Sequence, residues 1–314
     1  MLNRRQIRVK IMQALYGFIQ SEDDNLAAGE KSLLQSFERI YDLYLLQFAL
    51  LAEVHQAALR EREEANKKFL PTEEDKMKTT HFTESKVFSW IEQSNDLSIA
   101  LSKRRLSWDK FPDIGDKLFK KIRTLDLYKA YIHQEEVSEV DDINFLTKIS
   151  RMLLAEEEFL INIYDDENLH WNDDIDFVVI WLCKSLEQSN SQNGLKVFNL
   201  YKDEEADKKF AIDIFRDTVL HEKDYEEYIK EFAKNWETER IAFVDMLLMK
   251  MAISELLTQS GIPVKVTLNE YIELSKMFST AKSNVFINGI LDKIVIKLKS
   301  ENKLKKSGRG LIEK

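Results

Sequence analysis

The first chemically distinctive residues of the chain are four cations near its start, Arg4, Arg5, Arg8 and Lys10. Residues 1–20 contain no acid, so this stretch carries a net charge of +4. Arginine presents its donors in a planar fork that fits phosphate, and a local cluster binds a polyanion even on a protein that is not basic overall. The cluster therefore predicts a phosphate or nucleic-acid site, with a simply solvated terminus as the alternative.

The charge of the whole chain has the opposite sign. The sequence has a net charge of −9 at pH 7, which taken alone argues against a nucleic-acid partner. However, residues 294–314 also carry seven cations against two acids, so positive charge gathers at both ends of the sequence. We therefore expect a local polyanion site on an acidic body, and we expect residues 300–314 to form a basic, flexible tail.

Residue types that support catalysis or metal binding are not spaced to do so. The five histidines are scattered, and none forms a pair at metal-ligand spacing. The single cysteine, Cys183, lies in an apolar run beside Trp181 and Leu182, where it is expected in the core, and it excludes an intramolecular disulfide. No glycine-rich phosphate loop is present. The sequence predicts a protein without a catalytic site, a metal or a cofactor.

The elements that position these residues are predicted to be helices. The sequence has only 8 glycines and 3 prolines, too few for the many turns of a sheet protein, so we expect an all-α fold. On a helical wheel, Ile7 and Leu15 share the core face of a first helix. Residues 238–258 are apolar almost all round, which indicates a centrally buried helix. Thr267 and Glu270 have the spacing of a capping box at a further helix start.

The first helix also has a second stripe beside its core face. This stripe contains Arg5, Arg8, Met12, Tyr16 and Ile19. A stripe of arginine and large apolar side chains either packs inside the protein or meets a partner, and the residues alone do not decide between the two.

The sequence predicts a cytoplasmic protein. No apolar run approaches the roughly 18–20 residues of a membrane helix, so we expect no membrane association. No small-residue cleavage site follows the largely apolar residues 11–19, which argues against a secretory signal. An organellar transit peptide is the alternative for an arginine-rich start without acids.

Several segments, taken in order, resemble the NusB family of bacterial transcription antitermination factors. The match is without gaps from Asp245 to Lys293 and returns in the basic helix at residues 4–18. The residues that carry it are Ala14-Leu15-Tyr16, Phe215-Arg216-Asp217, Asn269-Glu270, Ile272-Glu273-Leu274, Ser275-Lys276 and Phe286-Ile287-Asn288-Gly289. The resemblance implies a NusB-like pair of small helical bundles without catalysis.

The chain is much longer than this resemblance covers. In common family members the first helix leads almost directly into the second, which the segment around Phe215 resembles. We therefore predict an inserted helical subdomain over residues 21–206, between a first helix at 1–20 and the remainder of the NusB-like core at 207–299. Alternatively, residues 31–60 supply the second helix and the insertion begins later. The role of the insertion does not follow from the sequence.

The resemblance implies a function in RNA binding. NusB family members bind the single-stranded boxA element of ribosomal RNA leader transcripts. They do so together with NusE, a small-subunit ribosomal protein, and the complex acts on elongating RNA polymerase. A boxA-like RNA, NusE and the RNA polymerase elongation complex are therefore the expected partners. The alternative is a helical scaffold of NusB fold that binds proteins and no RNA.

The resemblance also suggests which residues meet each partner. Single-stranded RNA binding combines cations with stacking and edge-reading groups, and the starts of the first and last predicted helices offer both. The expected RNA-binding residues are Arg4, Arg5, Arg8, Lys10, Lys282, Ser283, Asn284 and Phe286. Tyr16 and Asp245 match family positions that contact NusE. Alternatively, Phe286 belongs to the core and Asp245 is a solvated acid at a helix start.

Overall fold

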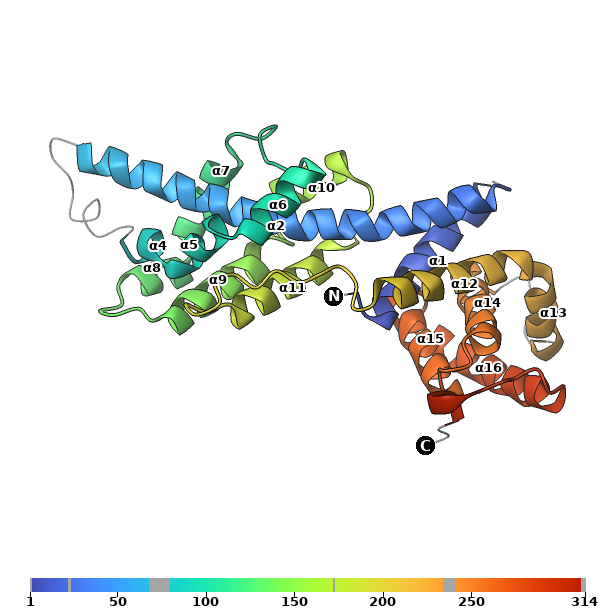
Figure 1. Cartoon of the computed structure of the whole chain (residues 1–314). Coiled ribbons are helices and arrows are strands. Elements are labelled where there is room, and N and C mark those ends of the chain that lie inside the picture. The colour runs from blue at the N-terminus through green and yellow to red at the C-terminus, as the bar shows by residue number, and fades with distance from the viewer. Residues whose placement is uncertain (1, 22–23, 68–79, 172, 234–240, 312–314) are drawn as a thin grey trace. The chain divides into compact units, whose positions relative to one another are not determined.

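The computed structural model of the chain consists of helices connected by loops (Figure 1). It describes residues 2–21, 24–67, 80–171, 173–233 and 241–311. These ranges contain no strand beyond one isolated bridge, between Asn190 and Gly194, so the predicted all-α class is confirmed. Among the helices in these ranges, none is both long enough and apolar enough to cross a membrane.

The chain forms two compact units. Unit 1 contains residues 1–37 and 201–314, and unit 2 contains residues 38–200. The long helix α2, Leu26–Lys67, contributes its first turns to unit 1 and the remainder to unit 2. The sequence-based prediction instead set an insertion at residues 21–206. The two divisions differ because α2 crosses the first boundary as one continuous helix, without a break in its residue pattern.

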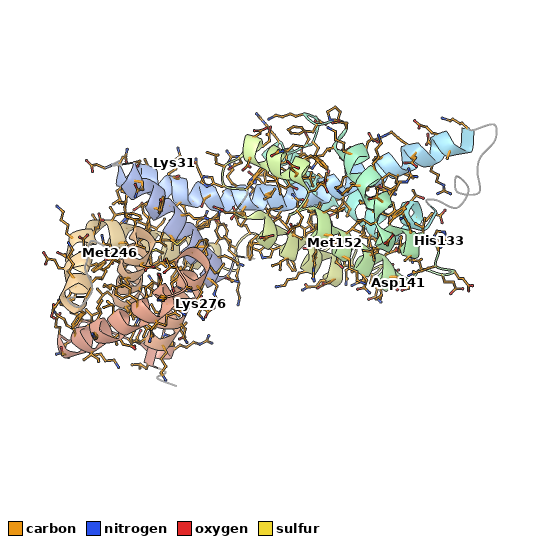
Figure 2. All side chains as sticks on the ribbon, turned by 180° about the vertical axis from the view of Figure 1, so that it is seen from behind. Lys31, His133, Asp141, Met152, Met246 and Lys276 are labelled. Carbon is orange, nitrogen blue, oxygen red and sulfur yellow. The ribbon has the colours of Figure 1, made fainter. Side chains whose placement is uncertain are left out.

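Unit 1 is a group of helices around α14. Its helices, besides the start of α2, are α1 (Arg4–Gln20), α12 (Glu204–Leu220), α13 (Glu222–Phe232), α14 (Phe243–Thr258), α15 (Val264–Phe278), α16 (Ser283–Ser300) and the short 3-10 helix η2 (Gly308–Leu311). α14 carries buried residues on all of its faces and packs against α1, α12, α13, α15 and α16. The predicted central helix is thus confirmed from Phe243 onward. Met246, which lies on this helix, is labelled in Figure 2.

α1 is fixed at its start by a capping box. The side chain of Asn3 accepts a hydrogen bond from the backbone N–H of Gln6 at 3.0 Å, and the N–H of Asn3 donates to the Gln6 side chain at 2.9 Å. These bonds satisfy donors that the first turn of a helix leaves open. Ile7 and Leu15 are fully buried, as the helical wheel predicts. Because Ile7 and Leu15 face the core, the directions of the other α1 side chains around the helix axis are fixed as well.

The start of α2 packs closely inside unit 1. Glu30 accepts two hydrogen bonds from Arg216 on α12, at 2.6 and 2.9 Å. At Gly29, an added Cβ atom would lie 2.8 Å from the rings of Phe18 and Phe215, so only glycine permits this approach. The start of α2 therefore contributes to the same helical unit as α1 and α12.

Helix α15 begins earlier than the sequence predicts. The proposed capping box of Thr267 and Glu270 is wrong, because α15 starts at Val264 and Pro263 occupies the cap position. The fixed φ of proline suits a helix start. Thr267 is instead fully buried and donates from its hydroxyl to Glu255 at 2.9 Å. Glu270 extends toward α1.

Unit 2 has a core of its own. Besides most of α2, it contains α4 (Thr80–Glu84), α5 (Lys86–Glu92), α6 (Asn95–Arg104), α7 (Ile114–Thr124), α8 (Asp126–Ile132), α9 (Glu139–Leu153), α10 (Glu158–Glu167) and α11 (Ile175–Gln188). Phe82, Phe88 and Phe145 are buried in this core, and the buried Trp108 donates from its indole to the carbonyl of Leu46 at 2.9 Å. Burial of this many aromatic rings offsets the entropy of ordering the segment.

The C-terminal segment differs from the free tail that the sequence predicts. Lys306 donates from its amine to the carbonyl of Gln259 at 2.9 Å, and the N–H of Ser307 donates to the carbonyl of Ser260 at 3.0 Å. Both acceptors belong to the loop that follows α14. Residues 303–311 therefore lie against unit 1, which the charge pattern alone does not indicate.

Candidate functional site

Arg8 and Glu255 form a buried ion pair between α1 and α14. Nε and Nη2 of Arg8 donate to the two carboxylate oxygens of Glu255, both at 2.6 Å, and the side chains are 2% and 0% exposed. Glu255 also accepts hydrogen bonds from Thr267 and, at 3.2 Å, from Tyr271. Burial opposes the charge of Arg8, but the hydrogen bond and charge of Glu255 raise its pKa above the ordinary value. The ion pair and the two hydroxyl groups that donate to Glu255 therefore link α1, α14 and α15.

Arg8 and Lys10 are buried, which does not fit direct contact with an RNA strand in this conformation. Each residue is only 2% exposed, although the sequence analysis assigned both to RNA binding. A buried cation contacts a phosphate only if the packing around it opens, and for Arg8 this would leave Glu255 as an unpaired buried charge. The structure thus gives Arg8 a role in holding α1 in place.

Arg4 and Arg5 reach the surface. Arg5 is 45% exposed and donates from Nε and Nη2 to Glu270 at 3.0 and 2.9 Å, and these bonds raise its pKa. Arg4 is 39% exposed, its guanidinium lies 4.2 Å from the ring centre of Phe210, and Asp207 is 3.4 Å away. Burial lowers the pKa of Arg4 despite the charge of Asp207. Both arginines therefore combine an accessible face with an acidic neighbour.

A cavity opens beside these two arginines. It has a volume of about 820 Å³, within the range of about 300–1,000 Å³ that small-molecule sites occupy. One part of its wall is basic and another part is apolar. The lining residues are Asn3, Arg4, Arg5, Arg8, Phe210, Gln259, Gly261, Ile262, Pro263, Val266, Glu270 and Arg309.

The opposite end of α1 carries an exposed aromatic pair. Tyr16 is 47% exposed and its ring meets that of Phe243, at the start of α14, edge to face with centres 5.2 Å apart. Phe243 is itself 38% exposed. The pair presents a large apolar area with a hydroxyl at its rim, which is the composition of protein-binding surfaces. Tyr16, which the sequence assigned to the NusE contact, is therefore accessible.

Asp245 and Ser283 are buried residues joined by a hydrogen bond. The hydroxyl of Ser283 donates to Oδ2 of Asp245 at 2.7 Å, and the residues are 3% and 5% exposed. The sequence analysis assigned Ser283 to RNA and Asp245 to NusE. Their burial instead makes them a link between the starts of α14 and α16. The second oxygen of Asp245 has no partner among the described residues.

The other expected RNA contacts at the start of α16 are more accessible. Lys282 is exposed, and Asn284 and Phe286 are half-buried. Oδ1 of Asn284 accepts a hydrogen bond from the N–H of Val285 at 2.9 Å. Because Phe286 is only half-buried, part of its ring is accessible, and it is not purely a core residue as the alternative proposed.

The expected site residues separate into two groups along α1. α1 and α14 run antiparallel, because Arg8 pairs near the end of α14 and Tyr16 meets its start. Arg5 and Tyr16 are eleven residues apart on nearly the same face of the helix, a separation of roughly 17 Å along its axis. Arg8 and Met12, between them, are buried. The stripe found in the sequence is therefore covered in the middle and open at both ends.

Phe210 and Arg309 are two of the cavity residues that the sequence did not predict as site residues. Phe210 lies under Arg4, and Arg309 belongs to the C-terminal segment. The signal for Arg309 was the unusual spacing of Gly308 and Gly310 around it. For Phe210 no signal exists in one sequence, because an apolar residue on an amphipathic helix is expected in the core.

The described residues contain no group of three or more His, Cys, Asp or Glu side chains that could hold a metal ion. Cys183 is fully buried, and burial raises the pKa of its thiol, which disfavours the reactive thiolate. The basic cavity contains arginines, one carboxylate and amides, which suit the binding of an anion better than nucleophilic attack.

Comparison with known proteins relates this chain to antitermination factors. Residues 181–295 match the sequence model of the NusB family. A protein of Salinibacter ruber named transcription antitermination protein NusB is 42% identical over 105 residues, which is 33% of this chain and 66% of that protein. Proteins of the same name from Chloroherpeton thalassium and Geobacter sulfurreducens are 42% and 45% identical, over 34% and 28% of this chain and 50% and 64% of their own lengths. No solved structure matched.

The matches cover only part of each protein. The chain spans between half and about two thirds of the length of these relatives. The family match begins at residue 181, inside α11 of unit 2, whereas unit 1 resumes at residue 201. We take the boundary at residue 201 from the packing, because α11 is buried among helices of unit 2. The chain therefore contains a NusB family domain.

Proposed function

We propose that this protein acts in transcription antitermination by binding single-stranded, boxA-like RNA together with NusE on elongating RNA polymerase. The observation that carries the proposal is the exposed part of α1, which offers cations at Arg4 and Arg5 near its start and an aromatic pair, Tyr16 with Phe243, near its end. The names of the related proteins support the same process. The proposal is that the protein is non-enzymatic and acts in the cytoplasm.

The RNA side of the proposal rests on charge combined with stacking surfaces. Single-stranded RNA is held by cations along its backbone and by aromatic rings under its bases. Arg4 and Arg5 supply accessible guanidinium groups, and Lys282 with Phe286 supplies a cation and a half-buried ring. A strand that contacts both groups would run from the start of α1 toward the start of α14, to which the start of α16 is bonded through Ser283.

The NusE side rests on the exposed pair of Tyr16 and Phe243. Interfaces between proteins are enriched in tyrosine and phenylalanine, and a few such residues account for most of the affinity. Because Tyr16 is near the start of α14 and the start of α16 is bonded to the same region through Ser283, the two partners would meet at adjoining surfaces. This arrangement allows RNA and NusE to bind to the protein at the same time.

One experiment tests the proposed function directly. Fluorescence anisotropy of a labelled boxA-like RNA is measured with the full chain, with and without NusE from the same organism, and a scrambled RNA serves as control. We expect binding that strengthens when NusE is added and weakens for the scrambled strand. Equal binding of both strands, or none, would contradict the proposal.

A scaffold that binds proteins and no RNA remains the second candidate function. The observation that favours it is that Arg4 and Arg5 already face acids, at Asp207 and Glu270. In that case NusE or another protein would still bind at Tyr16, and the labelled RNA would show no change in anisotropy at any salt concentration.

A further inference from the structure

The segment Gly308-Arg309-Gly310 forms a turn in which glycine is favoured at position 308 and required by space at position 310. Gly308 has a φ of +53°, a conformation that costs residues with a Cβ atom energy. Gly310 is buried, and an added Cβ atom would lie 2.0 Å from the carbonyl oxygen of Ser260. The N–H of Gly310 donates to the carbonyl of Ser307 at 2.9 Å. Arg309 therefore lies between one position where a side chain is strained and one where a Cβ atom has no room.

Further contacts fix the segment on the loop after α14. Ser307 donates from its backbone N–H to the carbonyl of Ser260 at 3.0 Å and from its hydroxyl to the hydroxyl of Ser260 at 3.1 Å. Lys306 is half-buried beside Gln259, and this burial lowers its pKa. The contacts carry the chain to one side of the basic cavity, where the exposed Arg309 forms part of the wall.

The three accessible arginines of the cavity differ in their partners. Arg4 and Arg5 are paired with Asp207 and Glu270. Arg309 makes no ion pair or hydrogen bond through its side chain with any residue that the structure describes. An arginine at a cavity that pairs with no acid among the described residues is available to an external anion.

Another part of the cavity wall is apolar. It is formed by Ile262, Pro263 and Val266, and Val266 is 43% exposed. A ligand that meets both walls must combine a negative group with a flat or apolar one. A nucleotide does so, since its phosphate suits arginine forks and its base or ribose packs on an apolar surface. The volume of about 820 Å³ is sufficient for one such unit.

We propose that Arg309 completes a nucleotide-binding subsite with Arg4 and Arg5, in which it holds a backbone phosphate of the bound RNA strand. This inference rests on the proposed RNA-binding function and extends the RNA surface to the C-terminal segment. The glycines on either side of Arg309 position the guanidinium. The apolar wall receives the adjoining base or ribose.

The test compares variants of the full chain in RNA binding. Arg309→Ala is measured beside Lys305→Ala, which removes the same charge from an exposed position of the same segment outside the cavity. We expect Arg309→Ala to weaken binding roughly tenfold and to reduce the slope of log K against log salt by about 0.7. Lys305→Ala should change the affinity much less. Gly310→Ala, which retains every charge but displaces the turn, should weaken binding as Arg309→Ala does.

The outcomes separate this inference from the proposed function. If the wild-type chain binds RNA and Arg309→Ala binds as tightly as Lys305→Ala, the subsite is overturned and the proposed function stands. If the wild-type chain binds no RNA, both are overturned. A free nucleotide is distinguished by adding AMP or GMP. If either binds in an Arg309-dependent way but does not displace the RNA, the subsite serves a free nucleotide and the assignment to the strand is wrong.

Discussion

Arg8 and Glu255 are joined by two hydrogen bonds of 2.6 Å in the interior of unit 1. Because Glu255 is also bonded to Thr267 and Tyr271, one carboxylate fixes α1 against α14 and α15. The register of α1 then determines which of its cations reach solvent. The candidate RNA surface thus depends on the buried pair of Arg8 and Glu255.

Arg8→Ala is expected to destabilise unit 1 by about 3–5 kcal/mol, since it leaves a buried carboxylate without its cation. Arg8→Met combined with Glu255→Met should recover part of this loss because no charge is left unpaired. Hydrogen exchange of α1, α14 and α15, followed by mass spectrometry, measures the effect separately from unit 2. Native protection of these helices together with lost RNA affinity in Arg8→Ala would mean that Arg8 is an RNA contact after all.

Ser283→Ala is expected to cost about 1–3 kcal/mol, because it removes the hydroxyl that donates to the buried Asp245. The neighbouring Asn284→Ala serves as control, since its side chain is more exposed. Hydrogen exchange of α14 and α16 reports the difference. A Ser283→Ala protein with native protection but weaker RNA binding would restore Ser283 as a direct contact.

Tyr16→Asp should abolish binding to NusE, because it places a charge in the exposed pair with Phe243. Ile296→Asp is a matched control, since Ile296 is also an exposed apolar residue of unit 1, at 69% exposure. Isothermal calorimetry with NusE measures both variants, and circular dichroism verifies their helicity. Equal affinity of the two variants for NusE would refute the assignment of Tyr16.

Unit 1 should lose stability in acid through Glu226. Hydrogen bonds from Lys230 and the buried Lys250 lower the pKa of Glu226 below its ordinary value of 4.5. Its ionised form therefore stabilises the fold at neutral pH, and this contribution disappears as the pH falls through the lowered pKa. Glu226→Gln should show a smaller difference in protection of α13 and α14 between pH 7 and pH 4 than Glu227→Gln, an exposed control. Identical differences would contradict this account.

The helical character and the burial pattern of unit 1 followed from the sequence. Few glycines and prolines indicated helices, and the wheel positions of Ile7 and Leu15 match their complete burial. A helical wheel gives the direction of a side chain, but it does not show which residue of another helix that side chain will contact. The partner of Arg8 is 247 residues away, so its burial could not be predicted from local spacing.

The C-terminal segment illustrates the same limit. Its lysines indicated a solvated tail, yet Gly308 and Gly310 form a turn that depends on the distant carbonyl of Ser260. The start of α2 shows the same limit, because Glu30 accepts a hydrogen bond from Arg216, which is 186 residues away in the sequence. In each case the decisive contact joins segments that only the tertiary fold brings together.

Removal of unit 2 should leave a folded unit 1. The rings of Phe37 and Tyr201, at its two boundaries, lie edge to face with centres 6.2 Å apart, so a short Gly/Ser linker can replace residues 38–200. We expect this variant to be helical and to bind RNA and NusE. A folded variant that binds neither would mean that unit 2 takes part in the site.

The salt dependence of RNA affinity reports whether α1 contacts the phosphates of the strand. The affinity of a boxA-like RNA is measured across salt concentrations for the wild-type chain, for Arg4→Ala combined with Arg5→Ala, and for Arg216→Ala. Arg216 is the control because it forms an equally bidentate pair, with Glu30, elsewhere on unit 1. The double variant should bind more weakly, with a slope reduced by about 0.7 for each lost phosphate contact, and Arg216→Ala should behave as the wild type. A double variant with wild-type affinity and slope would contradict the assignment of RNA binding to α1.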